Sequence, residues 1–277
     1  GNLWIGSHPT PMQGQYQVLY LDFSRASGGN GSLAENFDRY CSMAMDVFGK
    51  VYEPYYFPGY AKKMEAQPDF VSKLNYLNFH SAEYGAKLYL IIDEYDNFTN
   101  VVLNEQGNEI YHALTHASGF YREIFKKFKG MFERIFMTGV SPVTLDDLTS
   151  GFNIGWNIST DHRFNMMLGF SETDVRTMFN YYKEVGKLPA DADIDAMIQE
   201  MKPWYDNYCF AEESLGHDPK IFNCDMVLYY LRNYMTLGKS PKEMIDPNTR
   251  TDYNKMKRLI QLDKLDGNRK GVLRKIT

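Results

Sequence analysis

The sequence predicts an α/β fold with a parallel sheet, on the strength of two observations. Residues 88–92 are apolar and of strand length, and Asp93, Glu94 and Asp96 follow them directly. A run of this kind is typical of a strand that is buried on both faces, as in parallel sheets. In addition, strand-like runs alternate with helix-like segments over residues 16–140. This alternation is the pattern of βαβ units.

The elements follow in order along the chain. Strands are predicted at residues 16–23, 87–92 and 133–140, with one more at 152–159. Helices are predicted from residue 32 onward and at 68–84, 110–127, 171–185, 191–201 and 224–234. Ser32 and Glu35 form a capping box, and Pro68 suits a first helical turn. We expect an α/β domain over residues 1–165 and a helical subdomain over 166–277.

Composition narrows the class of protein. The 277 residues include 21 Tyr and 18 Phe, enough for a sizeable core without disulfides. The three cysteines are scattered and lack metal-binding spacing, which indicates a reducing, cytoplasmic location. There is neither a transmembrane-length apolar run nor a recognisable signal peptide, so we expect no membrane partner. The net charge of −5 argues against general nucleic-acid affinity, although residues 239–277 hold eleven Lys/Arg against five Asp/Glu.

Asp93 and Glu94 are the main candidate site residues. Burial of the preceding strand brings both acids to the carboxyl end of the sheet, where open α/β folds bind ligands. Two consecutive acids at this point suit a magnesium-nucleotide site, the first holding the metal and the second polarising the attacking water. This is a Walker B pattern. Acids also end many strands without a function, and the matching Walker A loop, GxxxxGK[ST], is not in the chain.

Other motifs are weaker. Thr138 and Ser141 place hydroxyls after another apolar run, where a turn is the ordinary explanation. Residues 28–31 resemble a phosphate loop but lack its lysine, so we interpret them as a turn. His112 and His116 lack the glutamate of a His-Glu-x-x-His zinc site and are interpreted as ordinary histidines. No Gly-x-Ser-x-Gly nucleophile motif is present.

Several stretches together resemble a known family. In order they are VLYLDFS (18–24), IIDEYD (91–96), TGVSPVTLD (138–146), LTSGFNI (148–154), GFSE (169–172), WYDNYCF (204–210) and DPNTRTDY (246–253). Each is weak alone, but the ordered set resembles the bacterial AAA-ATPase-like domain that usually precedes a PD-(D/E)xK nuclease-like domain.

The resemblance implies a P-loop NTPase sheet that lacks its Walker A strand. Strands follow the order 5-1-4-3-2 in such folds, so residues 16–23, 87–92, 133–140 and 152–159 correspond to strands 2, 3, 4 and 5. The Walker A segment and strand 1 are expected upstream of Gly1, and the nuclease-like domain after Thr277. The chain is therefore expected to be an internal piece of a longer protein, inactive alone.

The implied function is ATP hydrolysis with Mg²⁺, regulating the nuclease-like domain. Glu94, Thr138 and Ser141 are the expected catalytic residues, Asp93 the expected metal and nucleotide ligand, and Asp96 a weaker nucleotide-binding candidate. Expected partners are the nucleotide, the nuclease-like domain and nucleic acid. The alternative is a non-enzymatic scaffold with an NTPase-like fold. A third hypothesis is a metal-dependent phosphoesterase that uses Asp93, Glu94 and Asp96. It requires further inward-facing carboxylates, such as Asp22.

Overall fold

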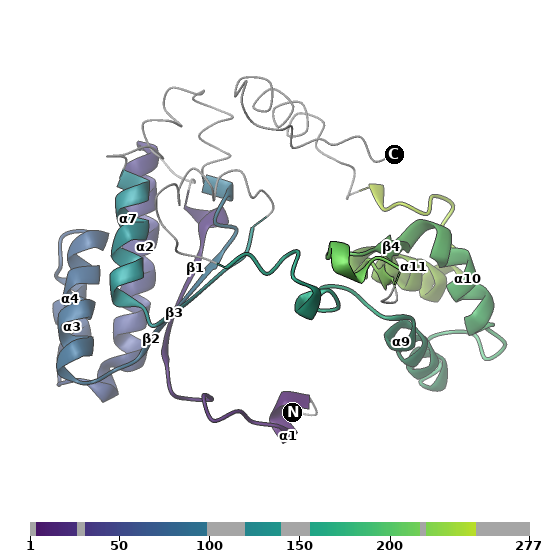
Figure 1. Ribbon diagram of the computed structural model, residues 1–277, viewed down its shortest axis with the longest axis horizontal. Helices are drawn as coiled ribbons and strands as arrows, with labels where there is room; N and C mark the ends of the chain where they lie inside the picture. Colours follow the sequence, from purple (N-terminus) through teal and green to yellow (C-terminus); the bar gives the residue numbers. More distant parts are fainter. Residues whose placement is uncertain (1–3, 27–30, 99–119, 140–155, 217–219, 248–277) are drawn as a thin grey trace. The chain divides into compact units, whose positions relative to one another are not determined.

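A computed structural model describes residues 4–26, 31–98, 120–139, 156–216 and 220–247 (Figure 1). The chain divides into two compact units, Gly1–Gly155 and Trp156–Thr277. The domain boundary predicted from the sequence lies further along the chain, near residue 165. No described helix is long and apolar enough to span a membrane.

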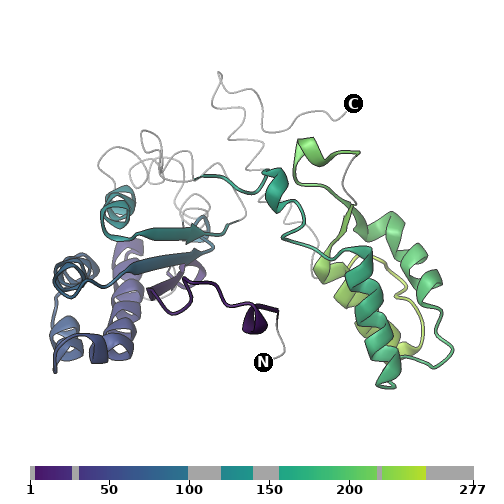
Figure 2. The same ribbon diagram turned by 60° about the horizontal axis from the view of Figure 1, so that its bottom comes forward.

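The first unit is built on a three-stranded sheet. Its strands are β1 (Gln17–Asp22), β2 (Leu88–Asp93) and β3 (Arg134–Met137). They are hydrogen-bonded in the order β1-β2-β3, and both pairs are parallel (Figure 2). This confirms the predicted α/β class, the parallel direction and the neighbour relationships of these strands. The register pairs Asp22 with Asp93, so both acids lie at the carboxyl edge of the sheet.

Helices cover one face of this sheet. The crossover from β1 to β2 contains α2 (Leu33–Tyr52), α3 (Tyr60–Glu65) and α4 (Phe70–Glu83), and α7 (Phe120–Met131) precedes β3. Figure 1 shows these helices on the same side of the strands. Parallel neighbours require crossovers of this kind because the chain must return to the starting end of the sheet.

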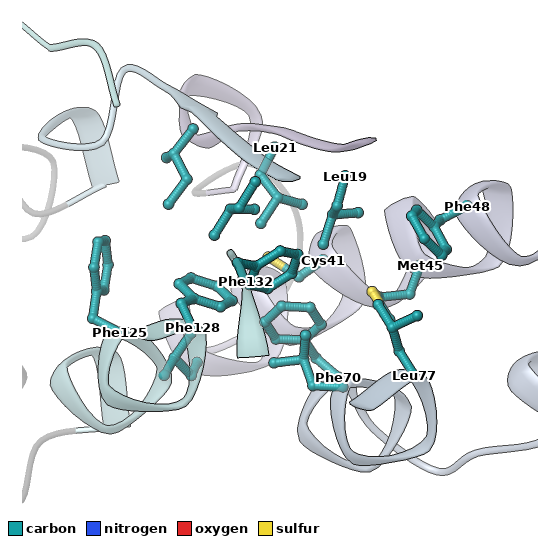
Figure 3. Close-up of a cluster of buried hydrophobic side chains, with 14 of the residues drawn as sticks. Leu19, Leu21, Cys41, Met45, Phe48, Phe70, Leu77, Phe125, Phe128 and Phe132 are labelled. Atoms are coloured by element: carbon teal, nitrogen blue, oxygen red, sulfur yellow. The ribbon is translucent and has the colours of Figure 1, made fainter. Parts of the chain in front are cut away.

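The core lies between this face and the helices. Alternate residues of β1 and β2 are buried, as the two-residue period of a strand requires. Figure 3 shows these side chains meeting aromatic and aliphatic residues of the helices. The labelled members of the cluster are Leu19, Leu21, Cys41, Met45, Phe48, Phe70, Leu77, Phe125, Phe128 and Phe132. The other face is more open, with Tyr20 52% exposed and Phe136 36% exposed.

Two tyrosines of α2 cover the outer edge of β1. The backbone N–H of Val18 donates to the Tyr52 hydroxyl, and that of Asp22 donates to the Tyr40 hydroxyl, each at 2.8 Å. An edge strand with free N–H groups invites pairing with other chains. The hydroxyls satisfy these donors, so β1 is a protected edge of the sheet.

The helix starts are set by local capping. Ser32 and Glu35 form the predicted capping box of α2. The α4 helix begins one position after its N-cap, Asp69, whose carboxylate accepts from the Ser72 N–H. Pro68 therefore precedes the cap, and its predicted place in the first turn is wrong. The aspartate provides a stronger cap than the preceding residues can, because its carboxylate satisfies a free helical N–H.

The second unit is mainly helical, as expected. It contains α9 (Glu172–Glu184), α10 (Ile194–Tyr205) and α11 (Cys224–Leu237). A short antiparallel pair, β4 (Asp206–Tyr208) and β5 (Ile221–Phe222), was not predicted. Among the described residues, the short elements are α1 (Trp4–Ser7), η1 (Phe23–Arg25) and η2 (Glu53–Tyr55) in the first unit, and η3 (His162–Phe164) and η4 (Glu212–Ser214) in the second.

The strand predicted at residues 152–159 is wrong where it can be checked. Residues 156–159 form no strand, and residues 152–155 lie outside the described ranges. The Asn157 side chain accepts from the Ser159 N–H at 3.0 Å, a local bond that favours a turn. The exposed Trp156 ring lies 4.2 Å from the Arg163 guanidinium carbon. Local contacts thus replace strand pairing here.

Candidate active site

Asp93 collects hydrogen bonds from three segments of the first unit. The Thr138 hydroxyl, just beyond β3, donates to Asp93 Oδ1. The Glu94 backbone N–H also donates to Oδ1, at 3.0 Å, and the Tyr20 hydroxyl of β1 donates to Oδ2 at 3.1 Å. All three strands therefore contribute to the orientation of one carboxylate at the carboxyl edge.

These contacts lower the pKa of Asp93. The Thr138 hydroxyl has the largest effect, and partial burial opposes it. The Tyr20 hydroxyl and the Glu94 N–H lower the pKa further. Donors to a carboxylate favour its charged form. Asp93 is therefore an ionised and oriented anion at neutral pH, a suitable ligand for a hard cation.

Glu94 occupies an unusual backbone conformation. Its φ is 50°, and among the described non-glycine residues it alone has a positive φ. The side chain is exposed, and its Oε2 accepts from the Asn97 side-chain amide at 2.8 Å. The Asn97 backbone N–H donates to the Glu94 carbonyl oxygen at 2.9 Å, which closes a turn. Glu94 thus projects outward beside Asp93 on a defined turn.

The turn after β2 is joined to the end of β3. The Thr138 N–H donates to the Ile92 carbonyl at 2.9 Å, and the Tyr95 N–H donates to the Thr138 carbonyl at 3.0 Å. The Tyr95 carbonyl in turn accepts from the buried Tyr121 hydroxyl of α7 at 2.7 Å. These bonds extend the pairing of β2 and β3 past both strands and bring Asp93, Glu94 and Thr138 together.

Asp96 lies in a different environment. It is 1% exposed, so its carboxylate is buried under the turn and does not share the solvent-facing position of Glu94. Gly139 packs directly above it, because a β-carbon there would lie 2.7 Å from Asp96 Oδ1 and would overlap the Tyr95 ring. Of the candidate residues, Asp96 is the one that the described structure turns inward. Ser141 lies outside the described residues.

Asp22 is beside Asp93 in register but has separate partners. Its Oδ1 accepts from both the Ser24 N–H, at 3.0 Å, and the Ser24 hydroxyl, at 2.6 Å. Arg25 Nε lies 3.6 Å from its Oδ2. Within the described ranges, no group of three or more His, Cys, Asp or Glu could hold a metal. The Asp22 carboxylate is thus bound by Ser24 and Arg25, partners that Asp93 does not share.

Two residues that bind the candidate acids, Tyr20 and Asn97, were not predicted from the sequence. Tyr20 is part of a strand, and its period-two relation to Asp22 is the only signal that it shares a face with the acids. Asn97 stands three residues after Glu94, a spacing suited to a turn. His112, His116 and residues 28–30 lie outside the described residues.

Comparison with known proteins identifies the family. A family model described as "Predicted AAA-ATPase" (AAA-ATPase_like) matches residues 1–149. The chain is also 28% identical, over 134 residues, to an "Uncharacterized protein in vnfD 5'region" of Azotobacter chroococcum mcd 1. The match covers 47% of this chain and 23% of that relative, so the chain spans about a quarter of the relative's length. No solved structure matches. Because the family model covers more than half of the sequence, the chain belongs to the AAA-ATPase-like family.

Proposed function

We propose that the first unit is part of a P-loop NTPase domain, and that its carboxyl edge holds the metal and the attacking water during ATP hydrolysis by the full-length protein. The observation that carries the proposal is the meeting of Asp93, Glu94 and Thr138 where β2 and β3 end. The strand order β1-β2-β3 agrees with strands 2, 3 and 4 of such a domain. Membership of the AAA-ATPase-like family supports the same reading.

Asp93 is proposed to hold a magnesium ion. Mg²⁺ in nucleotide sites takes one or two carboxylates, with phosphate oxygens and waters completing its shell. Asp93 supplies one carboxylate at the sheet edge, and the donors that lower its pKa favour the charged form. When bound, the ion neutralises charge on the outer phosphates. Thr138 and Tyr20 fix the orientation of the Asp93 carboxylate.

Glu94 is the proposed general base. Its exposed carboxylate stands next to Asp93 in the chain. It accepts a proton from the water whose oxygen bonds to the outer phosphorus, and ADP leaves with the electron pair of the broken P–O bond. Ser141 and Thr138 are proposed to contact the outer phosphate, with Thr138 also holding Asp93. Asp96 is a weaker proposal because it is buried beneath the turn.

Turnover in the full-length protein is proposed to regulate an attached nuclease-like domain, with nucleic acid as its partner. The family resemblance supports this step, and the scattered free cysteines support a cytoplasmic location. These proposals concern the whole protein, because this chain spans about a quarter of the length of its curated relative.

ATPase assays on the full-length protein test the assignment. Glu94→Gln should keep ATP binding and lose at least about a hundredfold in turnover, because it removes the base and preserves the shape. Asp93→Asn should weaken magnesium-dependent binding. Glu83→Gln, a change at a carboxylate bonded to His80 on α4, is the matched control and should leave both unchanged. Wild-type turnover in Glu94→Gln would contradict the proposed base.

The second candidate function is an interaction scaffold, which one feature of the second unit favours. Met166, Met167 and Leu168 are 43%, 47% and 64% exposed. The adjacent Asn165 accepts from the Phe210 N–H at 2.8 Å, which brings this run beside an exposed aromatic residue. Exposed apolar groups of this kind occur at binding surfaces. A full-length protein that binds partners normally but never hydrolyses ATP would favour this alternative.

A further inference from the structure

The backbone at Glu94 stores strain that its surroundings must offset. For a residue with a β-carbon, φ 50° is less favourable than ordinary conformations. Such strain persists only where neighbouring contacts determine the conformation. At this turn the flanking contacts are the Thr138 carbonyl on the Tyr95 N–H and the Tyr121 hydroxyl on the Tyr95 carbonyl. The backbone is thus held, but these bonds leave the Glu94 side chain able to rotate.

Asn97 supplies the contact to that side chain. Its backbone N–H closes the turn on the Glu94 carbonyl at 2.9 Å, and its side-chain amide reaches Glu94 Oε2 at 2.8 Å. The backbone and the side chain of Asn97 therefore both bind Glu94. The half-buried position of Asn97 restricts its own rotamers. A partly buried amide on a closed turn is a better anchor than a mobile surface side chain, because less conformational entropy is lost.

We propose that Asn97 is a positioning residue for Glu94. Its amide donates to one carboxylate oxygen and limits the rotamers of Glu94, so that the second oxygen points consistently towards the attacking water. Precise placement of a base has a large effect on rate, since a displacement of about 1 Å can cost roughly a hundredfold. The inference rests on the proposed function, because it assigns Glu94 the role of base.

The contact itself can be tested without nucleotide. In the ¹⁵N-labelled 277-residue chain, the Asn97 side-chain amide resonances should shift when Glu94→Gln removes the charge that they face. The same resonances should stay in place in Glu83→Gln, whose carboxylate is bonded to His80. Asn97 resonances that do not respond to Glu94→Gln would show that the contact is absent in solution, and the inference would fail.

Kinetics of the full-length protein then test the role. Asn97→Ala removes the donor, and Asn97→Asp keeps the shape while replacing the donor with an acceptor. Both should lower kcat by about tenfold to a hundredfold and leave KM for ATP within about twofold. Asn75→Ala, a change at an exposed asparagine of α4, is the matched control. Loss of positioning alone lowers kcat with KM unchanged, whereas a general loss of structure at the turn would also raise KM.

The outcomes separate the two claims. A wild-type protein that hydrolyses ATP, together with Asn97→Asp at wild-type kcat, overturns the positioning role and leaves the proposed function standing. A wild-type protein without ATPase activity overturns the proposed function, and the positioning role with it. Reduced kcat in both Asn97 variants with unchanged KM supports both.

Discussion

At Asp93, three donors meet one carboxylate, and each comes from a different strand or strand end. Thr138 makes the largest contribution to the lowered pKa, and Tyr20 and the Glu94 N–H add to it. A carboxylate with a lowered folded-state pKa stabilises the fold above the pKa of the unfolded chain and loses that contribution as pH falls through the folded value. The contribution of Asp93 to the stability of the fold is therefore expected to disappear as the pH falls through its lowered pKa.

Thr138→Val tests this dependence of stability on the Asp93 pKa. Removing the hydroxyl should raise the Asp93 pKa and lower the free energy of unfolding by about 1 kcal/mol at neutral pH, a value reduced for partial exposure. The difference between wild type and variant should shrink as pH falls through the lowered Asp93 pKa. Urea denaturation at a series of pH values measures it, and a difference that stays constant with pH would contradict the assignment.

Paired substitutions at Glu94 isolate its backbone strain. Glycine tolerates φ 50°, whereas alanine keeps the β-carbon that makes this conformation costly. Glu94→Gly should therefore be at least as stable as Glu94→Ala, by up to about 1 kcal/mol after the entropic cost of glycine is subtracted. Chemical denaturation of the two variants gives the comparison. A clearly more stable alanine variant would indicate that the turn relaxes.

The sequence was informative about residues whose role depends on local pattern. Asp93 and Glu94 could be selected because an apolar strand ends directly before them. Tyr20 and Asn97 could not, because their contacts depend on the register of β1 against β2 and on the course of the turn. Asp96 looked equivalent to its neighbours in sequence, and only the packing against Gly139 separates it.

Among the elements, the edge strand β1 depends on α2 in a way that periodicity does not reveal. Tyr40 and Tyr52 belong to the helix but complete the hydrogen bonding of the strand. This arrangement gives α2 two roles, since its apolar stripe covers the core while its tyrosine hydroxyls cover the edge. The protected edge agrees with the terminal position predicted for this strand.

Tyr40→Phe and Tyr52→Phe should each lower the free energy of unfolding by about 1 kcal/mol, because each leaves one strand N–H without its partner. The double variant should also self-associate more readily, since the edge of β1 is then unprotected. Tyr55→Phe, at a residue that is 67% exposed, is the control and should have little effect. Denaturation curves and light scattering report the two effects; double-variant stability equal to wild type would contradict the capping role.

Element prediction succeeded where start signals were strong. The capping box at Ser32 placed α2 correctly, and the apolar runs placed all three parallel strands. It failed at β4 and β5, because strands of three and two residues carry almost no periodic signal. It also failed at residues 156–159, where apolar residues make local contacts instead of pairing.

For the whole molecule, the 277-residue chain is expected to bind ATP weakly or not at all. No GxxxxGK[ST] loop is present in this sequence, and the backbone amides and lysine of such a loop hold the phosphates. Carboxylates without such a loop repel a triphosphate unless Mg²⁺ intervenes. Calorimetry on this chain with ATP and Mg²⁺ measures the affinity. A micromolar dissociation constant would show that other residues bind the phosphates.

We propose that the metal of a bound nucleotide lies at the carboxyl edge of the β1-β2-β3 sheet. Paramagnetic relaxation locates this metal in the full-length protein with Mn²⁺ and a non-hydrolysable ATP analogue. The amide signals of Asp22, Glu94 and Gly139 should broaden strongly. Those of Gln17 and Leu88, about 16 Å away at the other end of the strands, should broaden much less. Asp93→Asn should abolish the pattern. Broadening centred elsewhere, or unchanged in Asp93→Asn, would show that the metal does not lie at this edge.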